Sequence, residues 1–212
     1  MRGLDEIIVN AIMHTVKKEI SSKDIEDIEQ QLQNYGMHMT EIFSKFPEMK
    51  KSLLRFTDDL KIIEDEILKD FLTVEQDLKT SEIWLVIKNQ YMTELILKTF
   101  ADQDKKAIMD LIRDEAETIP KILERCKIPN TSGYRKMNQL IDEKMVTATG
   151  LAETFEGKRA ILYKSVIQRI QISINGNEVV SKISVDHETL DSSDIIRTIV
   201  EISQGKTKQM AN

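Results

Sequence analysis

Apolar residues recur at intervals of three and four along the first part of the chain. This spacing predicts an amphipathic helix over residues 4–16 and a second helix over residues 25–32. Ser21 and Asp24 have the spacing of a capping box at the start of the second helix, and Gly36 can end it. The chain is therefore expected to begin with a helical region.

The apolar stripe continues from Met49 to Ile67 in steps of three and four residues. It covers only about two heptads, whereas a coiled coil needs three or four. We expect this face to pack inside a helical domain, with a dimer seam as the alternative. Residues 1–75 are accordingly predicted to form a helical dimerisation or regulatory domain. A polar linker at 76–80 and another helical stretch from Ser81 to Phe100 follow.

A helix-turn-helix pattern occupies the middle of the chain. One helix is predicted over residues 118–126, with Pro120 tolerated in its first turn. Pro129 then forces a tight turn, because it keeps the residue before it out of the helical region. The next helix begins at residue 130 or 131. Its buried face is expected to contain Gly133, Met137, Leu140 and Ile141.

Two patterns typical of β-hairpins follow. The first joins residues 145–149 to 160–164 through a tip that contains Gly157-Lys158-Arg159. In the second, apolar residues at 170–174 and 179–185 flank Asn175-Gly176, which suits a type I′ turn. The expected fold is mainly α (α+β). A winged helix-turn-helix domain is predicted at 81–174, and the second hairpin strand, a C-terminal helix and the tail at 175–212.

Positive charge is concentrated in the middle region. The whole chain has a net charge of −6, yet residues 120–173 contain ten Lys or Arg and only five Asp or Glu. This segregation predicts a basic face on an acidic protein, which favours contact with nucleic acid on one side. The acidic remainder would repel phosphates wherever the basic face does not meet them.

Two cationic features have a shape that can reach a nucleic-acid groove. The major groove is about 12 Å wide and accepts one helix, whose first turns approach the base edges. A cation at a hairpin tip can enter the minor groove. The candidate DNA-binding residues in and around these features are Thr131, Ser132, Arg135, Lys136, Gln139, Lys158, Arg159, Lys121, Lys127 and Lys164.

Several segments between residues 94 and 174 have the order found in one family of regulators. These segments are Leu97–Asp102, Ala107–Ile112, Ile119–Leu123, Ile128–Pro129 and Tyr134–Met137 with Leu140. They resemble the ArsR-like winged helix-turn-helix regulators, particularly the archaeal ones. The resemblance implies that the helix opening at Thr131 reads DNA and that the protein binds as a homodimer. Two features depart from the family: Lys144 stands where a glycine usually ends that helix, and Cys126 has no second thiol.

Cys126 is the only cysteine, which excludes an internal disulfide and a multi-thiolate metal site and is typical of a reducing compartment. We expect its thiol to be buried rather than a redox switch. The acidic N-terminus does not resemble a secretory signal, and no apolar run approaches the ~18 residues of a membrane span. A cytoplasmic protein with no membrane partner is therefore predicted.

No grouping of residues indicates catalysis. Acidic residues cluster at 58–59 and 64–66, but no Gly-rich phosphate loop, Ser/His/Asp group or helical Glu/His pair accompanies them. Met37-His38-Met39 contains soft metal donors, yet methionine more often fills gaps in cores. We expect no enzyme activity, no metal and no cofactor.

The favoured hypothesis is a homodimeric transcription regulator that binds double-stranded DNA in a sequence-specific manner. The alternative is a non-enzymatic adaptor whose winged helix docks a protein partner, and the acidic balance of the whole chain favours it slightly. In either case the N-terminal helical domain is a candidate surface for a protein partner or for signal input.

Overall fold

The computed structural model describes residues 3–46, 56–77, 81–153, 159–176 and 178–205. The chain divides into two compact units, each built from helices and strands, so the fold is mixed α+β. Unit 1 consists of Met1–Ile7 and Glu94–Ile170. Unit 2 consists of Ile8–Thr93 and Gln171–Asn212.

The N-terminal helices follow the apolar spacing of the sequence. α1 spans Gly3–Glu19, α2 spans Ser22–Gln33 and α3 spans Met39–Ile42. Ser21 caps α2 by accepting a hydrogen bond from the backbone N–H of Asp24, as its position predicts. After α2, Gly36 has a φ of 68°, a left-handed conformation that glycine tolerates without strain.

The apolar stripe before residue 68 forms two consecutive helical segments. α5 spans Thr57–Lys61, and the π-helix η2 spans Ile62–Leu68. Leu60, Ile63 and Ile67 form the buried face of these segments. These side chains pack inside unit 2, so their apolar character does not require a dimer seam. Residues 49 and 53 of the stripe lie outside the described residues.

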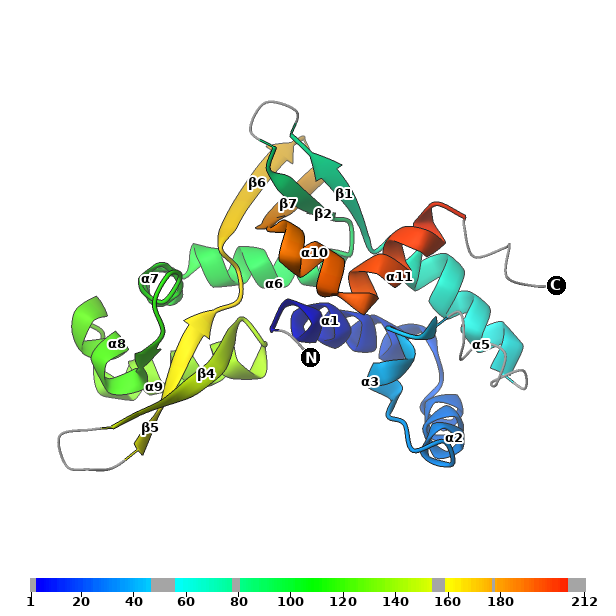
Figure 1. Cartoon of the computed structure of the whole chain (residues 1–212), viewed down its shortest axis with the longest axis horizontal. Helices are drawn as coiled ribbons and strands as arrows, with labels where there is room; N and C mark the ends of the chain where they lie inside the picture. The colour runs from blue at the N-terminus through cyan, green and yellow to red at the C-terminus, as the bar shows by residue number, and fades with distance from the viewer. Residues whose placement is uncertain (1–2, 47–55, 78–80, 154–158, 177, 206–212) are drawn as a thin grey trace. The chain divides into compact units, whose positions relative to one another are not determined.

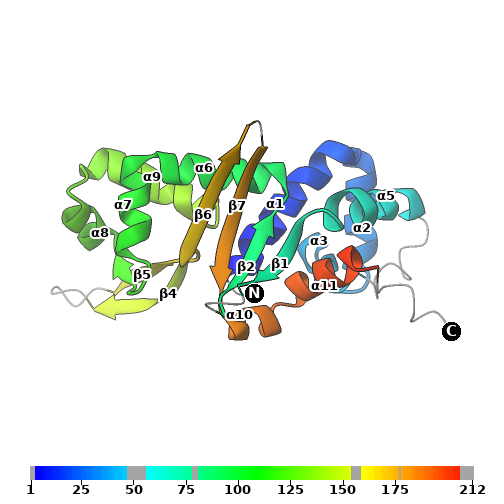
Figure 2. The same cartoon turned by 90° about the horizontal axis from the view of Figure 1, so that it is seen from above.

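The strands of unit 2 lie in a four-stranded sheet with the order β1-β2-β7-β6, and Figure 2 shows them side by side. The strands are β1 (Leu72–Gln76), β2 (Ile83–Ile87), β6 (Arg169–Asn175) and β7 (Glu178–Val185). β2 pairs antiparallel with β7, so that Ile83 lies opposite Val185. The neighbouring positions of β6 and β7 confirm the hairpin predicted around Gly176, whose φ is 61°.

Two short helices end the described chain. α10 spans His187–Ser192 and α11 spans Asp194–Ser203. The side chain of Ser193 caps α11 by accepting a hydrogen bond from the backbone N–H of Ile196 at 3.2 Å. The apolar face of α11 is buried, and α11 packs against β1 and η2. This agrees with the final helix that the sequence predicts.

The structure corrects the predictions for residues 76–87. The pattern from Ser81 favours a helix, but Ile83–Ile87 form strand β2. Five consecutive apolar residues suit a strand covered on both faces, and the helical spacing that begins near residue 90 hides that signal. The predicted linker at 76–80 begins inside strand β1, because Gln76 pairs with Ile83. Residues 78–80 lie outside the described residues.

The predicted domain boundaries also differ from the two units. Residues 171–212, divided in the prediction between two regions, belong to unit 2 together with residues 8–93. The predicted helix-turn-helix domain at 81–174 corresponds to the shorter segment Glu94–Ile170 in unit 1. The cause is the pairing of β2 with β7, two strands that are distant in sequence and that no local pattern connects.

Unit 1 combines a series of helices with a small sheet (Figure 1). The helices are α6 (Gln90–Ala101), which belongs to unit 1 from Glu94 onward, α7 (Gln103–Leu111), α8 (Ile119–Cys126) and α9 (Asn130–Asp142). The strands are β3 (Glu117–Thr118), β4 (Val146–Glu153) and β5 (Arg159–Ser165), in the order β3-β5-β4. β4 and β5 form the predicted first hairpin, with a bulge that leaves Thr149 as the extra residue.

Candidate nucleic-acid interface

The helix before the turn, α8, is short and amphipathic. Pro120 lies in its first turn, where the missing backbone N–H has no helical partner to lose. Ile122 and Leu123 are buried. The helix ends at Lys127, which has a left-handed φ of 55°, and the backbone N–H of Ile128 donates to the carbonyl of Leu123 at 3.0 Å. This bond closes α8 and starts the tight turn.

The next helix, α9, begins directly after Pro129 and has one buried and one polar face. Gly133, Met137 and Leu140 are buried, as predicted, while Ile141 is only half-buried. A Cβ at position 133 would lie 2.7 Å from Cδ1 of Leu123, so glycine allows α8 and α9 to approach closely. The exposed residues along the first turns of α9 are Asn130, Thr131, Tyr134, Arg135, Asn138 and Gln139.

Arg135 is a cation that α9 presents to solvent. Its side chain is exposed, and within the described part of the chain no acidic side chain forms an ion pair with it. The segment 130–139 contains no Asp or Glu. Ser132 is half-buried, and its hydroxyl donates to the carbonyl of Pro129 at 3.1 Å. Ser132 therefore also holds the start of the helix.

Lys136 does not lie on the exposed face, contrary to its prediction as a DNA contact. Its Nζ is 2.5 Å from Asp102 and 3.3 Å from Asp104, and its side chain is 15% exposed. Asp102 also caps α7 by accepting hydrogen bonds from the backbone N–H groups of Asp104 and Lys105. The hydrogen bond with Lys136 lowers the pKa of Asp102 and raises the pKa of Lys136. Lys136 therefore ties α9 to α7.

The predicted phosphate contacts lie on α8, at its end and on β5. Lys121 is exposed, with its Nζ 3.6 Å from a carboxylate oxygen of Glu117. Lys127 is exposed at the end of α8. Lys164 is half-buried on β5, opposite Thr147 of β4. The structure therefore leaves Lys121 and Lys127 accessible and Lys164 only partly so.

The described residues near the hairpin tip include charged side chains of both signs and exposed apolar side chains. Arg159 is exposed at the start of β5, but its cross-strand partner is Glu153, whose charge offsets part of its own. Lys158 lies outside the described residues. Along the same hairpin, Leu151 and Ile161 lie opposite each other and are 58% and 46% exposed. This apolar pair was not anticipated from the sequence.

Sequence reasoning also missed Arg125 and Tyr134. Arg125 is exposed in the last turn of α8, four residues after Lys121, and this spacing places both cations on one side of the helix. Tyr134 is 43% exposed on α9. Tyr134 lies beside the buried face formed by Gly133 and Met137, not on it. This position in the helical spacing could have indicated that its side chain is exposed.

Acidic residues gather in unit 2. Asp59 is half-buried in α5, and its pKa is raised first by burial and then by the negative charges of Asp24 and Asp58. Within the described ranges, no group of three or more His, Cys, Asp or Glu side chains is arranged to hold a metal. The negative charges of Asp24, Asp58 and Asp59 would repel phosphate.

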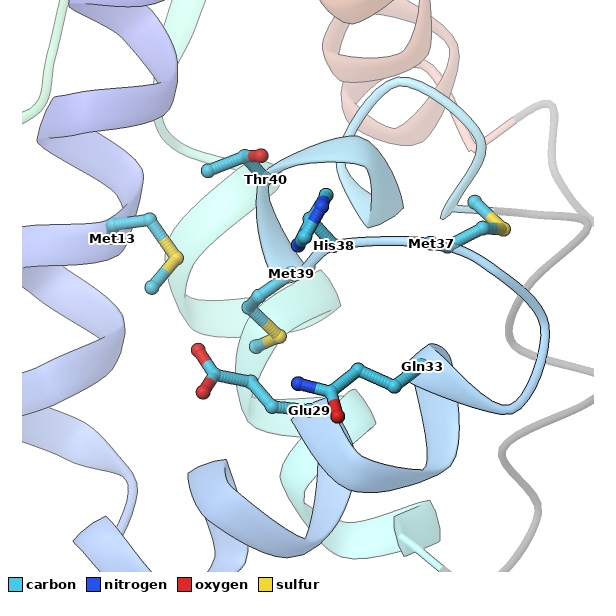
Figure 3. A pocket seen from close by; sticks show the side chains of 7 residues that line it. All are labelled: Met13, Glu29, Gln33, Met37, His38, Met39 and Thr40. Atoms are coloured by element: carbon cyan, nitrogen blue, oxygen red, sulfur yellow. The ribbon is translucent and has the colours of Figure 1, made fainter.

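A pocket of about 290 Å³ opens in unit 2. Figure 3 shows the side chains of Met13, Met39, Glu29 and Gln33 directed toward one another, whereas the side chain of Met37 points away from them. The two thioethers of the Met37-His38-Met39 motif are therefore not brought together. This arrangement gives the soft-metal interpretation of the motif no support.

The chain has no match among known protein-family models, curated proteins or solved structures. In the portion of the chain that the structure describes, no helix has both the length and the apolar character needed to cross a bilayer.

Proposed function

We propose that this chain is a sequence-specific DNA-binding transcription regulator with a winged helix-turn-helix, similar to the ArsR-like regulators. The order α7, β3, α8, α9, β4, β5 supports this, because it is the order of elements in that fold. The short turn between α8 and α9 also fits. In this arrangement α9 enters the major groove and the β4–β5 hairpin contacts the neighbouring DNA.

The observation that carries the proposal is the polar face of α9. It exposes Thr131, Arg135 and Gln139 on the part of the helix that contains no acidic residue. The helix N-terminus adds partial positive charge to the same end. A surface with hydroxyl, guanidinium and amide groups and no carboxylate matches phosphates and base edges.

The DNA-contact candidates of α9 have roles that their chemistry allows. Arg135 donates two hydrogen bonds to guanine, and Gln139, one turn later, pairs with adenine. Thr131 and Ser132 contact phosphate at the start of the helix. Lys136 acts indirectly in this proposal, because its ion pairs with Asp102 and Asp104 fix the position of α9.

The residues outside α9 provide contacts that position the protein on DNA. Arg159, together with Lys158, contacts the minor groove or the adjacent backbone. Phosphate contacts come from two accessible lysines on α8 and at its end, and from one partly accessible lysine on β5. These are Lys121, Lys127 and Lys164.

We further propose that the protein is a non-catalytic homodimer in the cytoplasm. Regulators with a helix-turn-helix commonly bind two half-sites about one turn of DNA apart, which requires two copies of the reading helix. Unit 2 supplies the dimer contact or the signal input, and it is the candidate surface for a protein partner. Its acidic side chains favour contact with proteins over contact with DNA.

Fluorescence anisotropy with the purified chain and labelled duplex DNA tests the proposal. Fragments selected from a random pool by the wild-type protein provide the specific probe. The substitution Arg135→Ala should weaken binding to this probe by roughly 5- to 100-fold and reduce discrimination at one base pair. Arg113→Ala is the control, because Arg113 lies in the turn after α7 and pairs with Asp110 of that helix. The control should bind as the wild type does.

Two results would contradict the proposal. A wild-type protein that fails to bind duplex DNA or heparin at low salt is not a DNA-binding regulator. Equal loss of affinity in the Arg135 and Arg113 variants would mean that only net charge matters, which would remove α9 as the reading helix.

One observation favours a second function, that of a protein-docking adaptor. Leu151 and Ile161 form an exposed apolar pair on the β4–β5 hairpin, and Tyr134 is exposed on α9. Apolar contact area is more useful for a protein partner than for phosphate. An adaptor would flow through heparin at low salt, and the double substitution Leu151→Ser/Ile161→Ser would abolish its co-purification with the partner.

A further inference from the structure

Two lysines with left-handed backbones stand at the two ends of α9. Lys127 has a φ of 55° and Lys144 a φ of 61°. Lys127 ends α8 just before the turn into α9, and Lys144 follows α9 two residues after its last residue, Asp142. In the described part of the chain, Ser81 is the other non-glycine residue with a positive φ.

The hydrogen bonds show that both lysines occupy glycine positions. At the end of α8, the N–H of Lys127 donates to the carbonyl of Glu124 at 3.1 Å. After α9, the N–H of Lys144 donates to Ile141 at 3.1 Å and the N–H of Met145 donates to Leu140 at 2.9 Å. Helix ends of this type favour glycine, because a Cβ in the left-handed conformation is strained.

The charged ends of Lys127 and Lys144 are open to solvent. Both side chains are exposed, and neither forms an ion pair with a described residue. Glu143, the neighbour of Lys144 in sequence, is already bound to Lys105 at 3.1 Å.

Interaction with the helix dipole does not account for Lys127. α8 already has Arg125 in its last turn, where a cation meets the helix dipole without backbone strain. Glycine at these two positions would relieve the strain of the left-handed backbone. A lysine in that place therefore indicates a role for the lysine side chain.

We propose that Lys127 and Lys144 are phosphate contacts that hold the two ends of α9 against the two backbones bordering the major groove. α9 has 13 residues and is therefore about 20 Å long, whereas the groove is about 12 Å wide. A helix that enters this groove has its ends near the sugar–phosphate chains. The inference rests on the proposed function and adds Lys144, which sequence reasoning did not assign to DNA.

The substitutions Lys127→Gly and Lys144→Gly test the inference through two readouts of opposite sign. Each should raise the melting temperature by a few degrees, because glycine relieves the strain. Each should also weaken DNA binding severalfold and lower the slope of log affinity against log salt by about 0.9. Lys144→Arg should keep both the affinity and the slope, because it keeps the charge.

Two control variants separate the explanations. Ser81→Gly relieves the same backbone strain in unit 2 and should raise the melting temperature without any change in DNA binding. Lys98→Ala removes an exposed positive charge from α6 and should leave the salt slope unchanged.

The outcomes distinguish this inference from the proposed function. If the wild type binds DNA but Lys144→Gly binds equally well, the phosphate contact at Lys144 is wrong and the DNA-binding function stands. If either glycine variant is less stable than the wild type, the lysine has a structural role and the premise of strain fails. If the wild type does not bind DNA, both proposals fail together.

Discussion

Nζ of Lys136 lies 2.6 Å and 2.5 Å from the two carboxylate oxygens of Asp102, so one lysine on α9 engages both oxygens of the residue that caps α7. The same carboxylate accepts two backbone hydrogen bonds at the start of α7. A single side chain thus fixes the first turn of α7 and the middle of α9. The orientation of α9 in unit 1 depends on this junction.

Removing the charge of Lys136 should destabilise unit 1. We expect Lys136→Met to lower the free energy of unfolding by about 1–2 kcal/mol, a value reduced because Asp102 remains one-third exposed and keeps its backbone hydrogen bonds. Urea denaturation followed by circular dichroism measures the change. The control Lys106→Met disrupts an exposed pair with Asp110 and should cost less than about 0.5 kcal/mol. Equal effects of the two substitutions would refute the structural role of Lys136.

The ion pair between Lys136 and Asp102 should lose its contribution to folding stability at both extremes of pH. The pKa of Asp102 is lowered from its ordinary value of 3.8, so its contribution is present above that value and disappears as the pH falls through the folded-state pKa. The pKa of Lys136 is raised from 10.5, so its contribution is complete below that value and disappears as the pH rises further. The stability difference between the wild type and Lys136→Met should therefore be largest near neutral pH. A difference that is constant from pH 2 to pH 7 would contradict this.

Close contact between α8 and α9 should make Gly133 intolerant of a larger residue. A Cβ at this position would lie 2.7 Å from Cδ1 and 3.1 Å from Cγ of Leu123, which is buried and cannot move freely. We expect Gly133→Ala to lower stability by about 1–2 kcal/mol, because overpacking outweighs the roughly 1 kcal/mol by which alanine favours a helix. Thermal unfolding measures this. Gly150→Ala, which has its nearest neighbour at 4.0 Å, should be close to neutral.

Cys126 should react slowly in the folded protein. Burial raises the pKa of its thiol above the ordinary 9.0, and the negative charge of Asp104 acts in the same direction against the opposing charge of Arg125. Since the thiolate is the reactive form, alkylation by iodoacetamide at pH 7.5 should be slower than for a small free thiol. Unfolding in guanidinium chloride should restore the rate. Labelling of the native protein as fast as in denaturant would instead identify an accessible redox thiol.

Local pattern was sufficient for most of the helices and for the β6–β7 hairpin, but not for the rest of the sheet of unit 2. The buried faces of α1, α2 and α9 could be read from spacing, because each helix repeats its apolar positions every three or four residues. Strand β2 could not, since a short apolar run has no period and its partner β7 lies far along the chain. Long-range pairing also explains why the unit boundaries escaped prediction.

In the candidate site, too, the features set by neighbouring residues could be predicted and those set by distant residues could not. The turn, the start of α9 and the exposed Arg135 follow from sequence positions that lie close together. Lys136 was misplaced because its partners, Asp102 and Asp104, lie more than thirty residues earlier and only the folded chain brings them near. The left-handed φ of Lys144 likewise depends on how α9 ends and not on the residue type.

The interruption of unit 2 by the segment Glu94–Ile170 sets an order for assembly on the ribosome. β2 is synthesised early, but its partner β7 emerges only after the whole intervening segment has been made. Until then the apolar run at residues 83–87 keeps one unpaired edge, which is a hazard for aggregation in a nascent chain. The helices and hairpin of residues 94–170 can condense during that interval, so the sheet that begins first is the last to close.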